Sequence, residues 1–246
     1  MPWSSLLLCR DDSYLRSAAG KVVAIADTGG IIVDRTNFYA TSGGQPGDTG
    51  YFERRDGSCI RIAGTICGET KDEIIHLPAP GQEMPAIGEA LVLRIDWERR
   101  HRLMRMHTAC HLLTVVCPYP ITGAAVGEEE SRIDFDMPEA GVTREEVTAR
   151  LMELVTRDHP VFTRLVAEEE LEANPGLVKS KNVRPPRGTG SVRLVCIGEN
   201  ASVDSQPCGG THVRSTGEIG PIHVARIEKK GRENRRFRIR FGELSA

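Results

Sequence analysis

The first hundred residues contain short apolar runs, rich in valine and isoleucine, that alternate with glycine-containing turns. Turns at 27–30 and 41–50 interrupt the runs before any of them reaches the length of a typical helix. Short β-branched runs bounded by glycine and polar residues are typical of strands. We expect strands at Lys21–Ala26, Ile31–Asp34, Ile60–Ile66, Glu73–Leu77 and Ala90–Ile95. Several short strands with little helix between them predict a small barrel or sandwich.

The pattern changes at Trp97, where a stretch without glycine or proline begins and continues to Cys117. Apolar side chains recur every three or four positions in this stretch, which predicts an amphipathic helix. They are Leu103, Met106, Cys110, Leu113 and Cys117. His107 and His111 lie beside this stripe, at the edge of the expected buried face. Because they are one helical turn apart, their imidazoles project from the same side of the helix.

After residue 118, strand-like and helix-like segments are mixed. Expected strands are Arg132–Phe135, Val161–Ala167, Val192–Ile197, Ile222–Lys229 and Arg235–Phe241, and expected helices are Thr143–Arg157 and Glu168–Ala173. Thr143 and Glu146 have the spacing of a capping box. Residues 179–191, rich in proline, glycine and basic side chains, predict a mobile loop. The second half is therefore expected to be α+β, with domains at 1–97 and 98–246.

Composition changes this picture little. The chain has 246 residues, of which 39% are hydrophobic and 27% charged, as in soluble globular proteins. No run approaches the roughly 20 apolar residues that span a bilayer. We find no targeting signal at the N-terminus, and the seven cysteines form no regular framework. We therefore expect reduced cysteines and a cytoplasmic protein.

The net charge of −2 gives no general attraction to nucleic acid, but the charge is unevenly distributed. Residues 226–240 contain eight lysines or arginines and two glutamates. From 236 to 241 basic and apolar residues alternate, which predicts a strand with one buried and one exposed face. Such a face is either simply solvated or in contact with a phosphate backbone.

A second pair of metal-capable side chains, Cys208 and His212, lies in a glycine-rich turn far along the chain from His107 and His111. Three imidazoles and one thiolate form a donor set that suits zinc. The peptidase motif His-Glu-x-x-His is excluded, because Thr108 stands where its glutamate would be. The wide separation of the pairs also excludes a standard zinc finger. A structural zinc and a hydrolytic zinc both remain open, since catalytic sites usually have three protein ligands and one open position.

The segment 38–50 is rich in glycine but has neither a P-loop nor a dinucleotide-binding pattern. From composition alone we interpret it as a wide hairpin loop. The tripeptide Asp-Thr-Gly occurs at 27–29 and again at 48–50. Two copies so close together cannot supply the two lobes of an aspartic protease, so both are interpreted as turns.

Three segments in combination, 37–50, 105–113 and 208–213, resemble the editing region of alanyl-tRNA synthetase. They are most similar to its free-standing relatives, the AlaX trans-editing proteins, and the glycine segment favours the medium-length class. The likeness runs from about residue 20 to the end and includes Glu218–Pro221. We expect the stand-alone form, because the chain is too short for a preceding aminoacylation domain. The resemblance implies a β-barrel-like N-terminal domain followed by a two-layer α/β editing domain.

The resemblance also implies an activity, which is hydrolysis of the ester that joins serine or glycine to tRNA(Ala). Accepting serine while rejecting alanine requires a group that binds the extra hydroxyl, either a polar side chain or the metal itself. Synthetase editing domains have a polar pocket residue where this chain has Ala125, and Thr122 is a nearby substitute. The choice between serine and glycine therefore stays open. A zinc-containing tRNA-binding module without turnover, and editing of threonyl-tRNA, are alternatives; the glycine segment argues against the latter.

The resemblance assigns residues to three kinds of site. The zinc ligands would be His107, His111, Cys208 and His212. Substrate contacts would come from Gly43, Gly44, Gln45, Gly209, Gly210 and Thr211, with Thr108 and Thr122 as further pocket residues. The tRNA acceptor end would meet Lys229, Lys230, Arg232, Arg235, Arg236 and Arg238.

Overall fold

The computed structural model describes residues 3–139, 141–182, 188 and 190–244. The chain forms two compact units, Met1–Arg102 and Leu103–Ala246. The fold is mixed α and β, as the sequence predicts.

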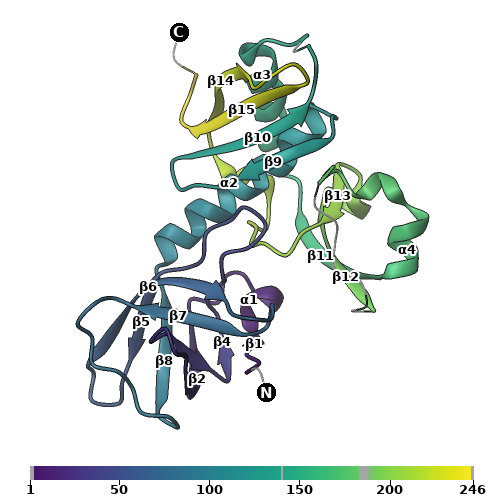
Figure 1. The fold of residues 1–246 in the computed structure, drawn as a ribbon. Helices are drawn as coiled ribbons and strands as arrows, with labels where there is room; N and C mark the ends of the chain where they lie inside the picture. Colours follow the sequence, from purple (N-terminus) through teal and green to yellow (C-terminus); the bar gives the residue numbers. More distant parts are fainter. Residues whose placement is uncertain (1–2, 140, 183–187, 189, 245–246) are drawn as a thin grey trace. The chain divides into compact units, whose positions relative to one another are not determined.

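The first unit is built around a closed barrel of six strands, which confirms the barrel-like prediction (Figure 1). The strands are β2 (Ser17–Ile25), β3 (Ile31–Val33), β5 (Gly50–Glu53), β6 (Cys59–Cys67), β7 (Ile74–Pro78) and β8 (Ala90–Ile95), in the order β2-β3-β7-β6-β5-β8. Each of the five expected runs overlaps one of them, with ends that differ by at most a few residues. The sequence analysis missed β5, whose four residues are too few to show a period.

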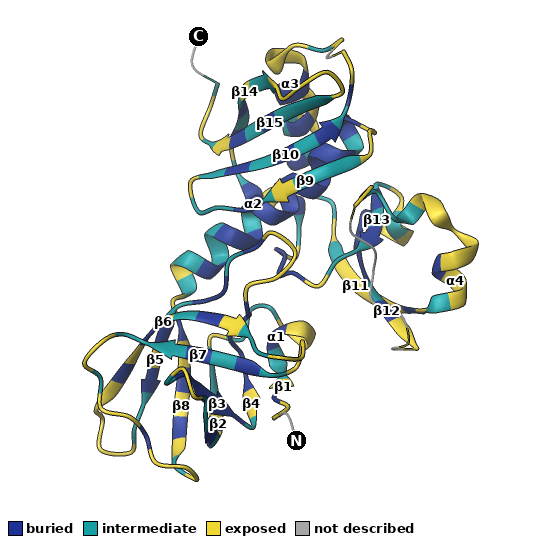
Figure 2. Ribbon diagram, in the orientation of Figure 1, coloured by how far each residue is buried: buried dark blue, intermediate teal, exposed yellow. Residues whose placement is uncertain are grey.

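Buried and exposed residues alternate along the barrel strands (Figure 2), and the buried ones form an apolar cluster inside the barrel. In β8, Leu91, Leu93 and Ile95 point inward while the residues between them are exposed. Phe38 and Phe52 pack edge to face inside, with ring centroids 5.5 Å apart. Closure pairs every strand on both sides, so the barrel itself has no open edge. Outside it lie the short helix α1 (Leu8–Asp11) and the parallel pair of β1 (Leu6–Leu7) with β4 (Arg35–Thr36).

Helix α2 (Trp97–Val116) confirms the long helix predicted from 97 to 117. All five residues of the predicted apolar stripe are buried. Burial extends further around the helix than the stripe, because Met104, Ala109 and Leu112 are fully buried as well. His107 and His111 are consequently buried, and the expectation that they lie at the edge of the buried face is wrong.

The second unit has a four-stranded antiparallel sheet with helices against one face (Figure 1). Its strands are β9 (Ile121–Ala125), β10 (Glu130–Asp136), β14 (Ile222–Lys229) and β15 (Asn234–Phe241), in the order β14-β15-β10-β9. Helix α3 (Arg144–Thr156) and the later turns of α2 lie against this face. The capping box predicted for Thr143 and Glu146 is present at the start of α3.

A second, three-stranded sheet carries part of the candidate site. It contains β11 (Val161–Ala167), β12 (Ser191–Ile197) and β13 (Asp204–Pro207), and α4 (Glu168–Ala173) follows β11. Three short 3-10 turns complete the unit: η1 (Pro175–Leu177), η2 (Glu199–Ala201) and η3 (Thr216–Ile219). Of the segment 179–191, which was predicted to be a mobile loop, residues 183–187 and 189 lie outside the described residues.

Candidate metal centre

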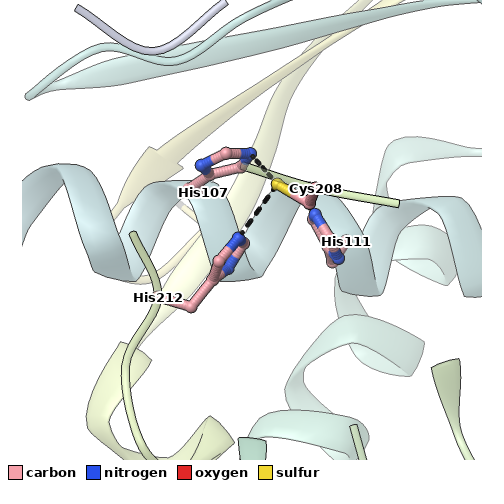
Figure 3. Close-up of side chains that lie close together, drawn as sticks. All are labelled: His107, His111, Cys208 and His212. Atoms are coloured by element: carbon pink, nitrogen blue, oxygen red, sulfur yellow. Dashed lines mark hydrogen bonds between the residues drawn. The ribbon is translucent and has the colours of Figure 1, made fainter. Parts of the chain in front are cut away.

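The four predicted metal ligands converge in the second unit (Figure 3). His107 and His111 come from helix α2, while Cys208 and His212 come from the segment that follows β13. One donor atom from each residue lies within 4.8 Å of all the others. Sγ of Cys208 is 3.5 Å from Nε2 of His107 and 3.3 Å from Nε2 of His212.

The donor types of this cluster suit a zinc ion, and the two distances from Cys208 match its ligand spacing. Zinc bonds of about 2.0–2.3 Å place tetrahedral ligands roughly 3.3–3.8 Å apart, close to the measured contacts of Cys208. The three imidazoles are buried, and Cys208 is half-buried. Burial alone would raise the pKa of the Cys208 thiol, but the adjacent His107 and His212 lower it well below its usual range. The thiolate, which is the form that binds metals, is therefore favoured.

The ring of His212 is oriented by Thr108, a residue that the sequence analysis placed in the substrate pocket. Thr108 is fully buried and donates its hydroxyl hydrogen to the carbonyl of Met104, 2.9 Å away. Its oxygen lies 3.1 Å from Nδ1 of His212 and accepts from it. The ring is thereby turned so that Nε2 faces Cys208. Thr108 thus contacts the nitrogen of His212 that does not face the cluster, and thereby fixes the orientation of this ring.

The ring of His111 faces a buried carboxylate that the sequence analysis did not identify. Nδ1 of His111 lies 3.3 Å from Oδ2 of Asp204, whose side chain is 1% exposed. Burial lowers the pKa of His111, but Asp204 and Cys208 outweigh burial and raise it to about 9. Asp204 and Gln206 are the buried, alternate residues of β13, and Cys208 follows at the same spacing. The spacing of two residues in Asp-x-Gln-x-Cys was the sequence signal that could have placed Asp204 on the same side of the strand as Cys208.

The turn that carries Cys208 is held by Arg193 of β12. Its Nη1 donates to the carbonyls of Cys208 and Gly210, at 2.7 and 3.1 Å. The N–H of Gly210 lies 3.3 Å from Sγ of Cys208, so the backbone also supports the thiolate. Of the three residues here that were predicted to contact substrate, Gly209 is exposed, while Gly210 and Thr211 are buried. A Cβ at Gly209 would meet no atom within 4 Å, as its exposure implies.

The other predicted substrate residues, Gly43, Gly44 and Gln45, lie in the first unit. Both glycines have positive φ, 57° and 84°, and are exposed in a tight turn closed by hydrogen bonds between Ser42 and Gln45. Left-handed φ at both central positions is the geometry that favours glycine. Gln45 is fully buried.

The loop that follows this turn is anchored by a buried ion pair. Both oxygens of Asp48 accept hydrogen bonds from Arg100, and Oδ2 also accepts from the backbone N–H of Tyr39. Arg100 also donates to the carbonyls of Ser13 and Asn37, at 2.8 and 2.7 Å. The glycine segment is therefore tightly braced, which the interpretation as a wide hairpin loop did not anticipate.

The six residues predicted to bind tRNA differ in their surroundings. Lys229, Lys230 and Arg232 are exposed at the turn between β14 and β15. Arg236 makes two hydrogen bonds to Asp134, at 2.6 and 2.7 Å. Arg238 bridges Glu130 of β10 and Glu228 of β14, and Arg235 donates to the carbonyl of Pro138.

The alternation predicted for β15 is confirmed, because Phe237 and Ile239 are buried between half-buried or exposed arginines. Thr122, the remaining pocket prediction, is half-buried in β9. It donates to Oδ1 of Asn234 at 2.7 Å. Among the described residues no helix is both long enough and apolar enough to cross a membrane.

Comparison with known proteins shows related sequences in both units. Residues 14–99 match the family described as tRNA synthetases class II (A), and residues 192–238 match the threonyl and alanyl tRNA synthetase second additional domain. The chain is 35% identical over 236 residues to the alanyl-tRNA editing protein AlaX-M of Methanosarcina mazei, with 92% of each chain covered.

Two further relatives are longer than this chain. It is 34% identical over 241 residues to the alanyl-tRNA editing protein AlaX-L of Pyrococcus horikoshii, covering 94% of this chain and 56% of that protein. It is 36% identical over 233 residues to the alanine–tRNA ligase of Pyrobaculum calidifontis, covering 89% of this chain and 25% of that enzyme.

Proposed function

The chain belongs to the AlaX family of alanyl-tRNA editing proteins, and from this premise we propose that it hydrolyses the ester of serine or glycine mischarged on tRNA(Ala). The observation that carries the proposal is the convergence of His107, His111, Cys208 and His212 on one buried point. A structural metal in a non-catalytic module would use the same four ligands, and the deacylation panel below separates the two readings. We propose zinc as the metal, because the donor set and its spacing suit that ion.

The metal and the chain contribute separately to this reaction. When bound, zinc supplies Lewis acidity for an ester carbonyl and lowers the pKa of water toward neutrality. The chain's own residues would hold the ion and orient the imidazoles, and the exposed Gly209 lies next to Cys208 on the side open to solvent. Buried Thr108 contributes by fixing His212, and we assign it no contact with substrate.

Selection against alanine requires a polar group that recognises the hydroxyl of serine. Thr122 stays our candidate, because its hydroxyl donates to Asn234 and its oxygen can still accept a hydrogen bond. Replacing Thr122 with valine keeps the shape and removes the hydroxyl. We expect the ratio of serine release to glycine release to fall. An unchanged ratio would remove Thr122 from the pocket.

For tRNA we propose that the exposed Lys229, Lys230 and Arg232 contact phosphates of the acceptor end. Arg235, Arg236 and Arg238 of β15 are included in this proposal; carboxylates of the sheet offset part of the charge of Arg236 and Arg238, and Arg235 donates to the carbonyl of Pro138. We further propose that the exposed turn of Gly43 and Gly44, supported by buried Gln45, contacts the substrate. Weaker binding at higher salt, in proportion to the number of phosphates contacted, would support the basic surface.

The deciding experiment is a deacylation panel. It uses Ser-tRNA(Ala), Gly-tRNA(Ala), correctly charged Ala-tRNA(Ala) and Ser-tRNA(Thr), with zinc measured in each preparation. We expect release from the first two only, and loss of both zinc and activity in Cys208→Ala and His111→Ala. His223→Ala is the matched control, since His223 is a half-buried histidine of the same unit whose Nδ1 contacts the carbonyl of Gly242.

Each outcome separates one reading from another. No release from any substrate would favour the non-catalytic module. Release from Ser-tRNA(Thr) alone would favour threonyl-type editing. A near-wild-type rate in Cys208→Ala or His111→Ala without bound zinc would refute a metal-dependent reaction.

A further inference from the structure

We propose that Asp204 is a positioning residue of the metal centre, which holds the ring of His111 so that its metal-binding nitrogen faces the cluster. The inference deepens the proposed function and rests on it. The observation behind it is that the two nitrogens of the His111 ring face different groups. Nδ1 lies 3.3 Å from Asp204, while the other nitrogen is turned toward Cys208 (Figure 3). Nδ1 is buried and makes no hydrogen bond of regular geometry with any described residue, Asp204 included, so the 3.3 Å approach to Asp204 is an ion-pair contact.

Asp204 is itself held from two further directions. Its Oδ1 accepts from the ammonium of Lys179, and its Oδ2 accepts from Nε2 of Gln206 at 2.7 Å. An isolated carboxylate that is 1% exposed would cost several kcal/mol to bury, and Lys179 offsets that cost. Because both oxygens are engaged, the carboxylate has little freedom to rotate away from His111.

The network returns to the helix that carries the histidine. Oγ1 of Thr114 accepts from Lys179 at 2.9 Å and lies 3.2 Å from Nε2 of Gln206. The same hydroxyl donates to the carbonyl of His111 at 2.8 Å. The carboxylate of β13 is therefore tied to the turn of α2 that presents His111, so that ring and carboxylate keep a fixed relation.

The pattern repeats at a second ligand with different chemistry. Thr108 contacts Nδ1 of His212 as Asp204 contacts Nδ1 of His111. Partners of this kind fix the tautomer and the orientation of a ligating imidazole, and their removal typically weakens metal binding 10- to 100-fold. Asp204 touches no reacting group in this account. A merely structural carboxylate could pair with Lys179 alone and would leave the metal affinity unchanged.

The test is zinc affinity, measured by competition with a chelator, for Asp204→Ala and Asp204→Asn. We expect about 10- to 100-fold weaker binding for the alanine variant. Asparagine keeps an oxygen acceptor, so a smaller loss is expected. The visible absorption of the cobalt-substituted protein should change in the alanine variant, because the imidazole of His111 is no longer held. Asp134→Asn is the matched control, since Asp134 is also paired with basic side chains but in the other sheet.

The outcomes separate this inference from the proposed function. If wild-type protein binds one zinc, and Asp204→Ala keeps its affinity and its cobalt spectrum, the positioning role is wrong while the proposed function stands. If wild-type protein binds no metal, the proposed zinc site itself fails. Should the alanine variant not fold, the zinc affinity of Asp204→Asn decides: weaker binding than in wild-type protein supports the role, and unchanged binding overturns it.

Discussion

Two fully buried histidines, one in each unit, respond to burial in opposite ways. In the barrel, burial lowers the pKa of His76 to about 4; its ring nitrogens lie at the hydroxyl of Thr36 and the carbonyl of Ile31, and its ring packs against two phenylalanines. In the second unit, Asp204 and Cys208 outweigh burial and raise the pKa of His111 to about 9. Burial by itself removes charge from an imidazole, whereas anionic neighbours make the same environment favourable to a cation.

The contrast extends to the buried carboxylates. Asp48 in the barrel unit has its cation within the chain, because Arg100 binds both of its oxygens. Asp204 has Lys179 as its cation, yet it lies beside a thiolate and three imidazoles whose donor atoms point at one another. The first arrangement is complete without any ligand. The second has the donor set of a metal site, and our proposal completes it with an ion, which is why we interpret one as structural and the other as functional.

The largest change in stability is expected when the buried carboxylate of Asp48 loses its partner Arg100. Arg100→Met leaves Asp48 buried and uncompensated, so the free energy of unfolding should fall by about 3–5 kcal/mol. Both tryptophans, Trp3 and Trp97, belong to the first unit, so tryptophan fluorescence in urea reports its unfolding. Arg94→Met is the control, because its pair with Glu53 is exposed and should change stability by under about 1 kcal/mol. Equal losses in both variants would break the comparison.

The pH dependence of the barrel unit should follow His76. Because its pKa is about 4 in the folded chain and near 6.5 when unfolded, protons favour the unfolded state. The contribution of neutral His76 to the free energy of unfolding is fully present above about pH 6.5 and is lost as the pH falls toward 4. It amounts to about 3 kcal/mol. Urea unfolding at pH 7 and pH 4.5 measures it. His76→Gln should lack this part of the pH dependence, and a variant that retains it would show that another group is responsible.

Zinc should stabilise the second unit by mass action. At free zinc about 100-fold above Kd, the free energy of unfolding should rise by about 2.7 kcal/mol. Circular dichroism during urea unfolding, with and without zinc, measures this gain. In Cys208→Ala the gain should be largely lost. A gain that survives in that variant would place the metal elsewhere.

The smallest effect is expected when Thr108, the uncharged residue that orients His212, loses its hydroxyl. Thr108→Val keeps the volume of the side chain and removes the hydroxyl that accepts from His212. We expect about tenfold weaker zinc binding in a chelator competition. Thr156→Ala is a control, since Thr156 is an exposed helical threonine that bonds only to a carbonyl of its own helix, that of Met152. A larger loss for Thr108→Val than for Asp204→Ala would reverse the order of the two orienting groups.

Local patterns made much of the fold predictable. The period of three to four residues identified α2, and the Thr143 capping box marked the start of α3. The metal ligands could be named because their side-chain chemistry and paired spacing are legible without coordinates. The features that could not be predicted depend on residues far apart in the sequence. The buried pair of Arg100 and Asp48 is one of them, because the two residues are 52 positions apart and no local pattern joins them.

Asp204 was missed for a similar reason. Strand β13 has only four residues and includes a proline, so no hydrophobic alternation marks it. Its buried face is polar, and polar alternation ordinarily indicates exposure. The burial of His107 and His111 was also underestimated, because the segment 208–213 packs on a side of the helix that the apolar stripe leaves unmarked.

The central claim is tested most directly by titrating metal-depleted protein with zinc while single-turnover hydrolysis of Ser-tRNA(Ala) is measured. The account predicts that the rate rises until one equivalent has been added and then stays constant, and that Cys208→Ala gains little at the same zinc concentrations. A full rate in the metal-depleted protein, unchanged by zinc, would contradict it.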